Sequence, residues 1–305
     1  MPNKNFDNCV SFFIDNGAFQ GRLIRLNNVL DTILTKHAYP LPVSGVIAEC
    51  TVLATMLAST LKYDGLFTLQ TQSNGPVPMV VVDVTSEGKV RACSRFDQDR
   101  LNAGQTLRKT LGEIEPAPHL MGGGHLAFTV DQGKNTDLYQ GIVDLQGKTL
   151  AECALRYFKQ SEQIETNLKL FLQAPQGESK TWLAAGIMLQ KMPVKGGNEI
   201  DAETAKEAWN EANIFMESLS ENEVFNADLS SQEILHRLFH GNNLNISQTK
   251  EYSFGCRCSR DKLFETLGTF SQEDIATMVE NGKISATCHF CSECYTFDAG
   301  ELLKQ

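Results

Sequence analysis

The sequences GCRCSR at residues 255–260 and CHFCSEC at residues 288–294 hold five of the nine cysteines of this 305-residue chain. Two close pairs, CxC and CxxC, separated by a helical stretch, can supply the four sulfur ligands of a tetrahedral zinc site. His289 lies between two of these cysteines, but four sulfurs already satisfy zinc. We therefore predict one Zn²⁺ per chain in the reduced protein, with these ligands: Cys256, Cys258, Cys288 and Cys291.

The segment between the cysteine pairs predicts two short helices, over 259–268 and 271–282, the second opened by a capping box of Ser271 and Asp274. A unit this small buries too little apolar surface to fold alone, because a core below about 70 residues rarely suffices without a metal or disulfides. We predict that residues 251–305 form a zinc-binding redox-switch domain whose fold depends on the metal.

The four thiolates also predict redox chemistry. Zinc itself is not oxidised or reduced, but it keeps the sulfurs deprotonated, which is the form that oxidants attack. Each close cysteine pair can form a disulfide once the metal leaves. Loss of the metal would remove what folds the domain, so a local reaction of sulfur would become an unfolding event.

The segment before this domain, residues 196–250, predicts an acidic helical linker. Between Glu199 and Glu233 it carries ten acidic residues and one basic residue, Lys206. Two capping boxes, at residues 220–223 and 230–233, open short helices. An apolar stripe of four residues lies on one helix: Trp209, Ala212, Met216 and Leu219. Because like charges repel and the stripe is thin, we predict a metastable linker that docks only marginally on the first domain.

In residues 1–195, apolar residues recur with the spacing of strands in some stretches and with the spacing of helices in others. This pattern predicts one α+β domain. The expected strands are 21–26, 66–72, 78–85, 90–96, 125–132, 139–145, 167–174 and 181–191. The expected helices are 29–37, 42–62 and 150–160. Strands 66–96 have hairpin spacing with Gly in each turn, so we expect an antiparallel meander. Cys50 and Cys153 fall on helical stretches and are expected to be buried, whereas Cys9 and Cys93 receive no role.

Composition and motifs exclude several classes. A net charge of −10 argues against a polyanion as the main partner. The longest apolar stretch, 43–61, carries Glu49 and predicts a buried helix, so we expect no membrane span. We also expect no secretory signal at the N-terminus. We expect a cytoplasmic location and no enzyme activity, because no hydrolase, kinase or dinucleotide motif occurs and the glycines at 122–124 form no phosphate loop.

Runs along nearly the whole chain resemble one known family. They include GRLIRL (21–26), YPLPV (39–43), NGPV (74–77), YQGIV (139–143), YFKQSEQIET (157–166), GIMLQKMP (186–193), HRLFH (236–240) and FGCRCSR (254–260), with CHFC (288–291) at that family's separation. The chain resembles the redox-regulated heat-shock holdase chaperones, the thirty-three-kilodalton heat-shock protein family.

The resemblance implies a zinc-bound, reduced, inactive monomer that peroxide or hypochlorous acid converts, under unfolding conditions, into an active form. The ligands would then form two disulfides, Cys256–Cys258 and Cys288–Cys291. The linker would unfold, and the protein would dimerise and hold unfolding client proteins without ATP. Cys294 departs from the family pattern, and it could replace a ligand, mis-pair on oxidation or link two chains.

An unfolded linker would offer a flexible apolar surface to clients, through Trp209, Phe215, Met216 and Leu219. Two other functions remain open. A zinc module that binds nucleic acid or the ribosome would have local basic support from Arg257, Arg260 and Lys262. A thiol-disulfide oxidoreductase could use residues 288–291, although a thioredoxin-type motif would follow a strand and open a helix in a βαβ unit.

Overall fold

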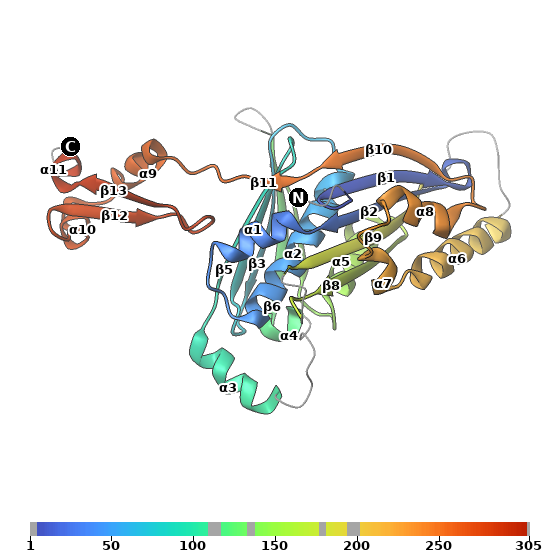
Figure 1. Ribbon diagram of the computed structural model, residues 1–305, viewed down its shortest axis with the longest axis horizontal. Coiled ribbons are helices and arrows are strands. Elements are labelled where there is room, and N and C mark those ends of the chain that lie inside the picture. The colour runs from blue at the N-terminus through green and yellow to red at the C-terminus, as the bar shows by residue number, and fades with distance from the viewer. Residues whose placement is uncertain (1–4, 109–116, 133–137, 177–180, 194–201, 304–305) are drawn as a thin grey trace.

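A computed structural model of the protein describes residues 5–108, 117–132, 138–176, 181–193 and 202–303 (Figure 1). Two β-sheets pack against the long helix α2 (Leu41–Thr60) and form the main body of the molecule. The last helices and strands form a small module that projects from one side of this body. The predicted α+β fold is confirmed.

The first sheet has five antiparallel strands, in the order β10-β1-β2-β9-β8. Their bounds are Asn245–Glu251, Asn8–Ile14, Phe19–Leu26, Leu183–Lys191 and Thr166–Gln173. Strand β10, which lies inside the predicted linker, pairs with β1 and closes one edge of this sheet. The chain between the main body and the cysteines therefore belongs partly to the sheet.

The second sheet has six strands, in the order β11-β5-β4-β3-β6-β7. Their bounds are Ser253–Phe254, Lys89–Arg95, Met79–Thr85, Leu66–Ser73, Gly124–Asp131 and Tyr139–Asp144. The predicted meander β3-β4-β5 is confirmed. Strand β11 is parallel to β5 and pairs through two residues only, immediately before the first cysteine pair.

Helix α2 fills the space between the sheets. It has Pro42 in its first turn, as predicted, and most of its residues are buried. By length and composition it is the one described helix that could cross a membrane, but its burial between two sheets is that of a core helix. Helices α1 (Asn28–Thr35), α4 (Ala117–Met121) and α5 (Leu150–Tyr157) contact α2, whereas α3 (Gln98–Arg108) projects away from the sheets (Figure 1). A short 3-10 helix at Asp15–Gly17 joins β1 to β2, and a π-helical segment at Phe158–Glu162 continues α5.

The central strands β2 and β9 of the five-stranded sheet carry buried apolar side chains on both faces. Ile24 and Met188 face the core around α2, whereas Leu23 and Ile187, their neighbours along β2 and β9, belong to a second core. That second core is covered by three linker helices, α6 (Ala202–Ser218), α7 (Glu221–Val224) and α8 (Ser231–Phe239). Both predicted capping boxes are present.

The linker helices dock more deeply than a thin stripe would allow. Ala212, Met216 and Leu219 of the predicted stripe are at most 1% exposed. They are joined by further apolar residues of the linker: Val224, Phe225, Leu229, Ile234, Leu235 and Phe239. Lys169 on β8 donates to the carbonyl oxygens of Glu217 and Leu219, which end α6. The contact between the linker and the sheet is therefore wider than the four-residue stripe and forms a continuous second core.

A buried arginine connects the sheet to the linker. Arg25 on β2 is fully buried and donates to the carbonyl oxygens of Asn226 and Leu229, both at 2.6 Å. Its guanidinium also lies 4.1 Å from the ring of Phe6. Burial lowers the pKa of Arg25 to about 10. The linker carbonyls thus replace water around a buried cation, and this stabilising contact disappears if the linker leaves.

Candidate metal centre

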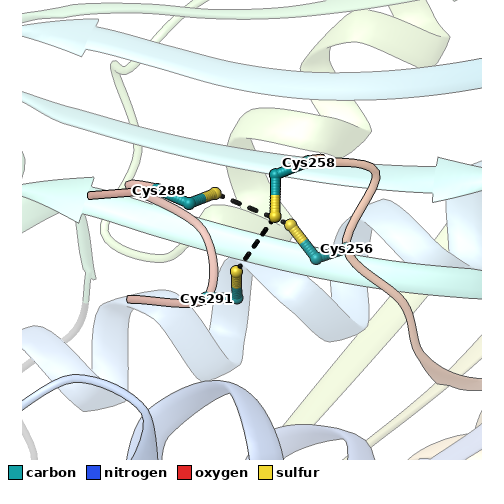
Figure 2. A group of neighbouring side chains, drawn as sticks. All are labelled: Cys256, Cys258, Cys288 and Cys291. Carbon is teal, nitrogen blue, oxygen red and sulfur yellow. Dashed lines mark hydrogen bonds between the residues drawn. The ribbon is translucent and has the colours of Figure 1, made fainter. Parts of the chain in front are cut away.

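Four cysteines converge from two loops (Figure 2). Cys256 and Cys258 lie between β11 and α9 (Arg260–Leu267), and Cys288 and Cys291 lie in the turn that joins β12 (Lys283–Thr287) to β13 (Cys294–Asp298). All four sulfur atoms lie within 4.8 Å of one another. The fold brings together the four residues that the sequence predicts as ligands.

The distances fit a tetrahedral metal. The Sγ atoms of Cys256 and Cys288 are 3.6 Å apart, and those of Cys258 and Cys291 are 3.4 Å apart. Four sulfurs that bind one Zn²⁺ at about 2.3 Å would be separated by about 3.8 Å. The cluster could therefore hold a metal ion, and an all-thiolate ligand set suits a soft or borderline metal such as zinc.

The thiols differ in how readily they ionise. Burial raises the pKa of Cys288 and of Cys291. Burial acts in the same direction on Cys256, but hydrogen bonds with Cys258, Cys291 and Arg91 lower its pKa to about 7. Metal binding requires thiolates, and the lowered pKa of Cys256 favours that form.

The rest of the module has little core of its own. Besides α9, β12 and β13 it contains α10 (Gln272–Thr277) and α11 (Ala299–Leu302). Its buried apolar cluster consists of Leu267, Ile275, Ile284, Phe297 and Leu302. So few buried side chains agree with the expectation that a metal is needed to hold the fold.

One element of the module differs from the prediction. Helix α10 ends at Thr277, earlier than the predicted residue 282. Asn281 and Gly282 have positive φ angles, so the backbone turns there and enters the hairpin β12–β13. The Ser271 cap at the start of α10 is confirmed, since its hydroxyl accepts from the Asp274 amide.

A model of the Hsp33 protein family matches residues 7–298, nearly the whole chain. The chain belongs to the Hsp33 family. A 33 kDa chaperonin from Caulobacter vibrioides is 38% identical over 296 residues, which cover 96% of this chain and 95% of that protein. A 33 kDa chaperonin from Pseudomonas fluorescens is 33% identical and covers 100% of this chain, with 94% of its own length aligned.

A solved structure shares the fold. The crystal structure of a 33 kDa chaperonin, the heat shock protein 33 homolog of Thermotoga maritima, superimposes with a TM-score of 0.80. The superposition covers 98% of this chain and 98% of that chain, and the two sequences are 22% identical. The relatives of this Hsp33 chain are named as chaperonins, so the chain belongs to a family of chaperones and not to a family of enzymes.

The oxidoreductase alternative lacks its structural context in this Hsp33 family member. Residues 288–291 lie in the turn of a two-stranded hairpin, between β12 and β13. A thioredoxin-type motif would instead open a helix after a strand. His289 is exposed and lies outside the sulfur cluster, and so does Cys294, at the start of β13.

The basic residues that supported nucleic-acid binding have partners within the chain. Arg257 pairs with Asp83 at 3.3 Å, and Arg260 pairs with Glu301 at 3.5 Å. The Lys262 ammonium donates to the carbonyl oxygen of Arg257 at 3.1 Å. The contact of Arg257 joins the module to the main body, and those of Arg260 and Lys262 lie within the module.

The four residues predicted to contact clients all lie on α6 or at its end. Met216 and Leu219 are buried in the second core, and Trp209 and Phe215 pack against it half-buried. The ring centroid of Trp209 lies 5.3 Å from that of Phe19 on β2. In this Hsp33 chain the candidate client surface is therefore covered by the chain's own sheet.

Two residues of the main body that contact the cysteine loops carry no signal in the sequence. Arg91 lies 3.8 Å from the Cys256 sulfur, and His37 lies 3.0 Å from the Ser292 hydroxyl. Arg91 is separated from Cys256 by 165 residues, and it stands in a strand with no local pattern to mark it. Only the tertiary structure could identify these contacts. Cys9, Cys50, Cys93 and Cys153 are all buried, which confirms the expectation for Cys50 and Cys153.

Proposed function

We propose that this chaperone is a redox-regulated holdase that works without ATP, inactive when reduced and zinc-bound and active after oxidation. The observation that carries the proposal is the cluster of four cysteine sulfurs. Its first pair follows β10 and β11, which come directly after the linker helices that dock on the sheet. One Zn²⁺ per chain would be held by Cys256, Cys258, Cys288 and Cys291. Bound zinc would fix the two loops together and keep the thiols ionised.

Oxidation would act on the ligand sulfurs. Each disulfide removes two electrons from a pair of thiolates, and hydrogen peroxide accepts them, takes up two protons and leaves as two water molecules. A disulfide sulfur is no longer a thiolate ligand, so the module would lose what holds its loops together. With a core of five buried apolar side chains, the module would then unfold.

Unfolding of the module would be transmitted to the linker through the intervening strands. Strand β11 pairs with the edge strand β5 through two residues only. Along the chain, β10 connects α8 to β11. Release of α6–α8 would uncover the outer face of the five-stranded sheet together with the client-binding residues Trp209, Phe215, Met216 and Leu219. It would also return Arg25 to water, which relieves part of the cost of burying its charge.

We also propose how the chain is divided, which molecules it binds and when it dimerises. Residues 1–195 would act as the chaperone core, 196–250 as the metastable linker and 251–305 as the redox switch. The partners would be unfolding client proteins in the cytoplasm, with no role for nucleic acid or membranes. The protein would be a monomer when reduced and a homodimer when oxidised, because exposed apolar faces associate.

Aggregation of a heat-unfolding client should be suppressed only by the oxidised protein. The measurement is light scattering with equal amounts of this protein, either reduced and zinc-loaded or treated with peroxide at elevated temperature. The physical reason is that only the treated sample exposes the apolar face under the linker. Suppression by neither sample, or equally by both, would contradict redox gating.

Peptide mapping of the oxidised sample should find Cys256 joined to Cys258 and Cys288 joined to Cys291. The sulfurs that approach across the two loops belong to residues 32 and 33 positions apart, so they separate when the module unfolds. Pairs within one loop stay close, and closing them costs little entropy. Trypsin cleaves after Arg257, so the first disulfide would join two peptides, while Cys294 should remain open to alkylation. A Cys256–Cys288 bond would contradict this pairing.

A further inference from the structure

The guanidinium of Arg91 stands where the main body meets the cysteine loops. Arg91 lies on β5 and is mostly buried, with 13% of its side chain exposed. One of its terminal nitrogens lies 3.8 Å from the Sγ atom of Cys256. Its guanidinium carbon lies 3.8 Å from the ring centroid of Phe290, the residue between His289 and Cys291. A single side chain therefore contacts both cysteine loops.

Asp83 fixes this arginine. One carboxylate oxygen of Asp83, on the neighbouring strand β4, accepts from Arg91 Nε at 2.8 Å and lies 2.6 Å from a terminal nitrogen of the same guanidinium. The other oxygen accepts from the Thr68 hydroxyl at 2.7 Å. Two nitrogens of one guanidinium meet the same carboxylate oxygen, and these two contacts hold the guanidinium plane in one orientation. Arg91 is thus presented to the cysteine loops by the rigid sheet.

The module side contributes further contacts to the same place. Arg257, between the first two cysteines, also pairs with Asp83 at 3.3 Å. Ser292, directly after Cys291, is within hydrogen-bond distance of His37 Nδ1 at 3.0 Å. The His37 ring in turn stacks on Tyr39, with centroids 4.8 Å apart. Both cysteine loops are therefore seated on the main body as well as on each other.

We propose that Arg91 is a positioning residue for the metal centre, which makes metal retention depend on the seating of the C-terminal module on the sheet. The inference rests on the proposed zinc site. Groups that hydrogen-bond to metal ligands orient them, and their loss typically weakens metal binding by about 10- to 100-fold. A cation also balances the net negative charge of four thiolates on one Zn²⁺. Undocking alone, without oxidation, would then loosen the metal.

The test compares zinc affinity in fully reduced proteins by competition with a chromophoric chelator. Arg91→Ala is expected to bind zinc about 10- to 100-fold more weakly than the wild type. Arg91→Lys should lose most of the same affinity, because an ammonium keeps the charge but offers neither the two-nitrogen contact with Asp83 nor the planar stack. Arg95→Ala is the matched control, since Arg95 is an exposed arginine four residues along the same strand. It should bind zinc like the wild type.

Arg91→Ala removes a partner of buried Asp83 and could therefore disturb the main body. A second variant separates this effect from the loss of the contact with the cysteine loops. Phe290→Ala removes the stack from the module side and leaves the pair of Arg91 and Asp83 in place. Phe290→Ala should also lower the zinc affinity. The double variant should bind zinc no more weakly than the weaker of the two single variants. Hydrogen exchange of residues 288–292 should be faster in both single variants, since their loops are no longer seated.

Wild-type affinity in Arg91→Ala or in Phe290→Ala would overturn the inference, and so would fully multiplicative effects in the double variant. A lysine variant that matches the wild type would also overturn it, because charge alone would then suffice. If the wild type holds no zinc, the proposed function fails together with this inference. If all variants hold zinc equally, the inference alone fails.

Discussion

Replacing Cys288 with serine is expected to abolish tight zinc binding and to unfold the C-terminal module. The apparent binding energy of a structural zinc site is about 10–16 kcal/mol, and a large share of it is lost with one of four thiolates. The module cannot compensate, because its own core holds five buried apolar side chains. Zinc content after dialysis and protease sensitivity of residues 255–303 measure the two effects.

Cys294→Ser is the matched control for this experiment. Cys294 lies six residues from Cys288 in the same hairpin but is exposed and outside the sulfur cluster. The control should keep one zinc per chain and a protease-resistant module. If Cys288→Ser keeps tight zinc, the ligand set is wrong. If Cys294→Ser loses zinc, the fifth cysteine replaces one of the four.

The convergence of the four cysteines and most strands could be predicted because their signals are local. The close spacing of Cys256 with Cys258, and of Cys288 with Cys291, restricts how a folded chain can place them. The capping boxes at Ser220 and Ser230 act within three residues, and both are present. Such patterns are decided by neighbouring residues, so the sequence carries them directly.

The depth of the linker core could have been predicted from the strands but was not. Strands β2 and β9 are buried along almost their whole length on both faces. In β9 the run from Leu183 to Leu189 is continuously apolar, which is typical of a strand covered on both sides and means that something must cover the second face. Strand β2 gives no such signal, because it carries Gln20, Arg22 and Arg25. The stripe on α6 accounts for only part of that cover, and the rest comes from α7, α8 and the turns between them.

The contacts of Asp83, Arg91 and His37 with the cysteine loops could not be predicted. Each residue stands in an ordinary strand or helix end, and its partner lies far along the chain. Charge pairs of this type depend on how two separately folded parts meet. No periodicity or spacing in the sequence encodes that meeting.

Replacing Met216 with glutamate is expected to make the reduced, zinc-loaded protein suppress client aggregation without peroxide. Met216 is fully buried between α6 and the five-stranded sheet. Burying an unpaired carboxylate there would cost several kcal/mol, which is comparable with the stability of a docked segment. Helix α6 would therefore leave the sheet while the metal centre stays intact. Light scattering and binding of an apolar dye in the reduced state measure the result.

Ile214→Glu provides the matched control, because it adds the same charge two residues away on the same helix. Ile214 is 66% exposed, so its replacement should leave both dye binding and the redox requirement unchanged. Equal zinc content in both variants separates linker release from damage to the metal centre. If Met216→Glu binds dye but does not suppress aggregation, either the face under α6 is not the client surface or clients need Met216 itself. If it suppresses aggregation while still zinc-bound, the metal centre acts on clients only through the linker.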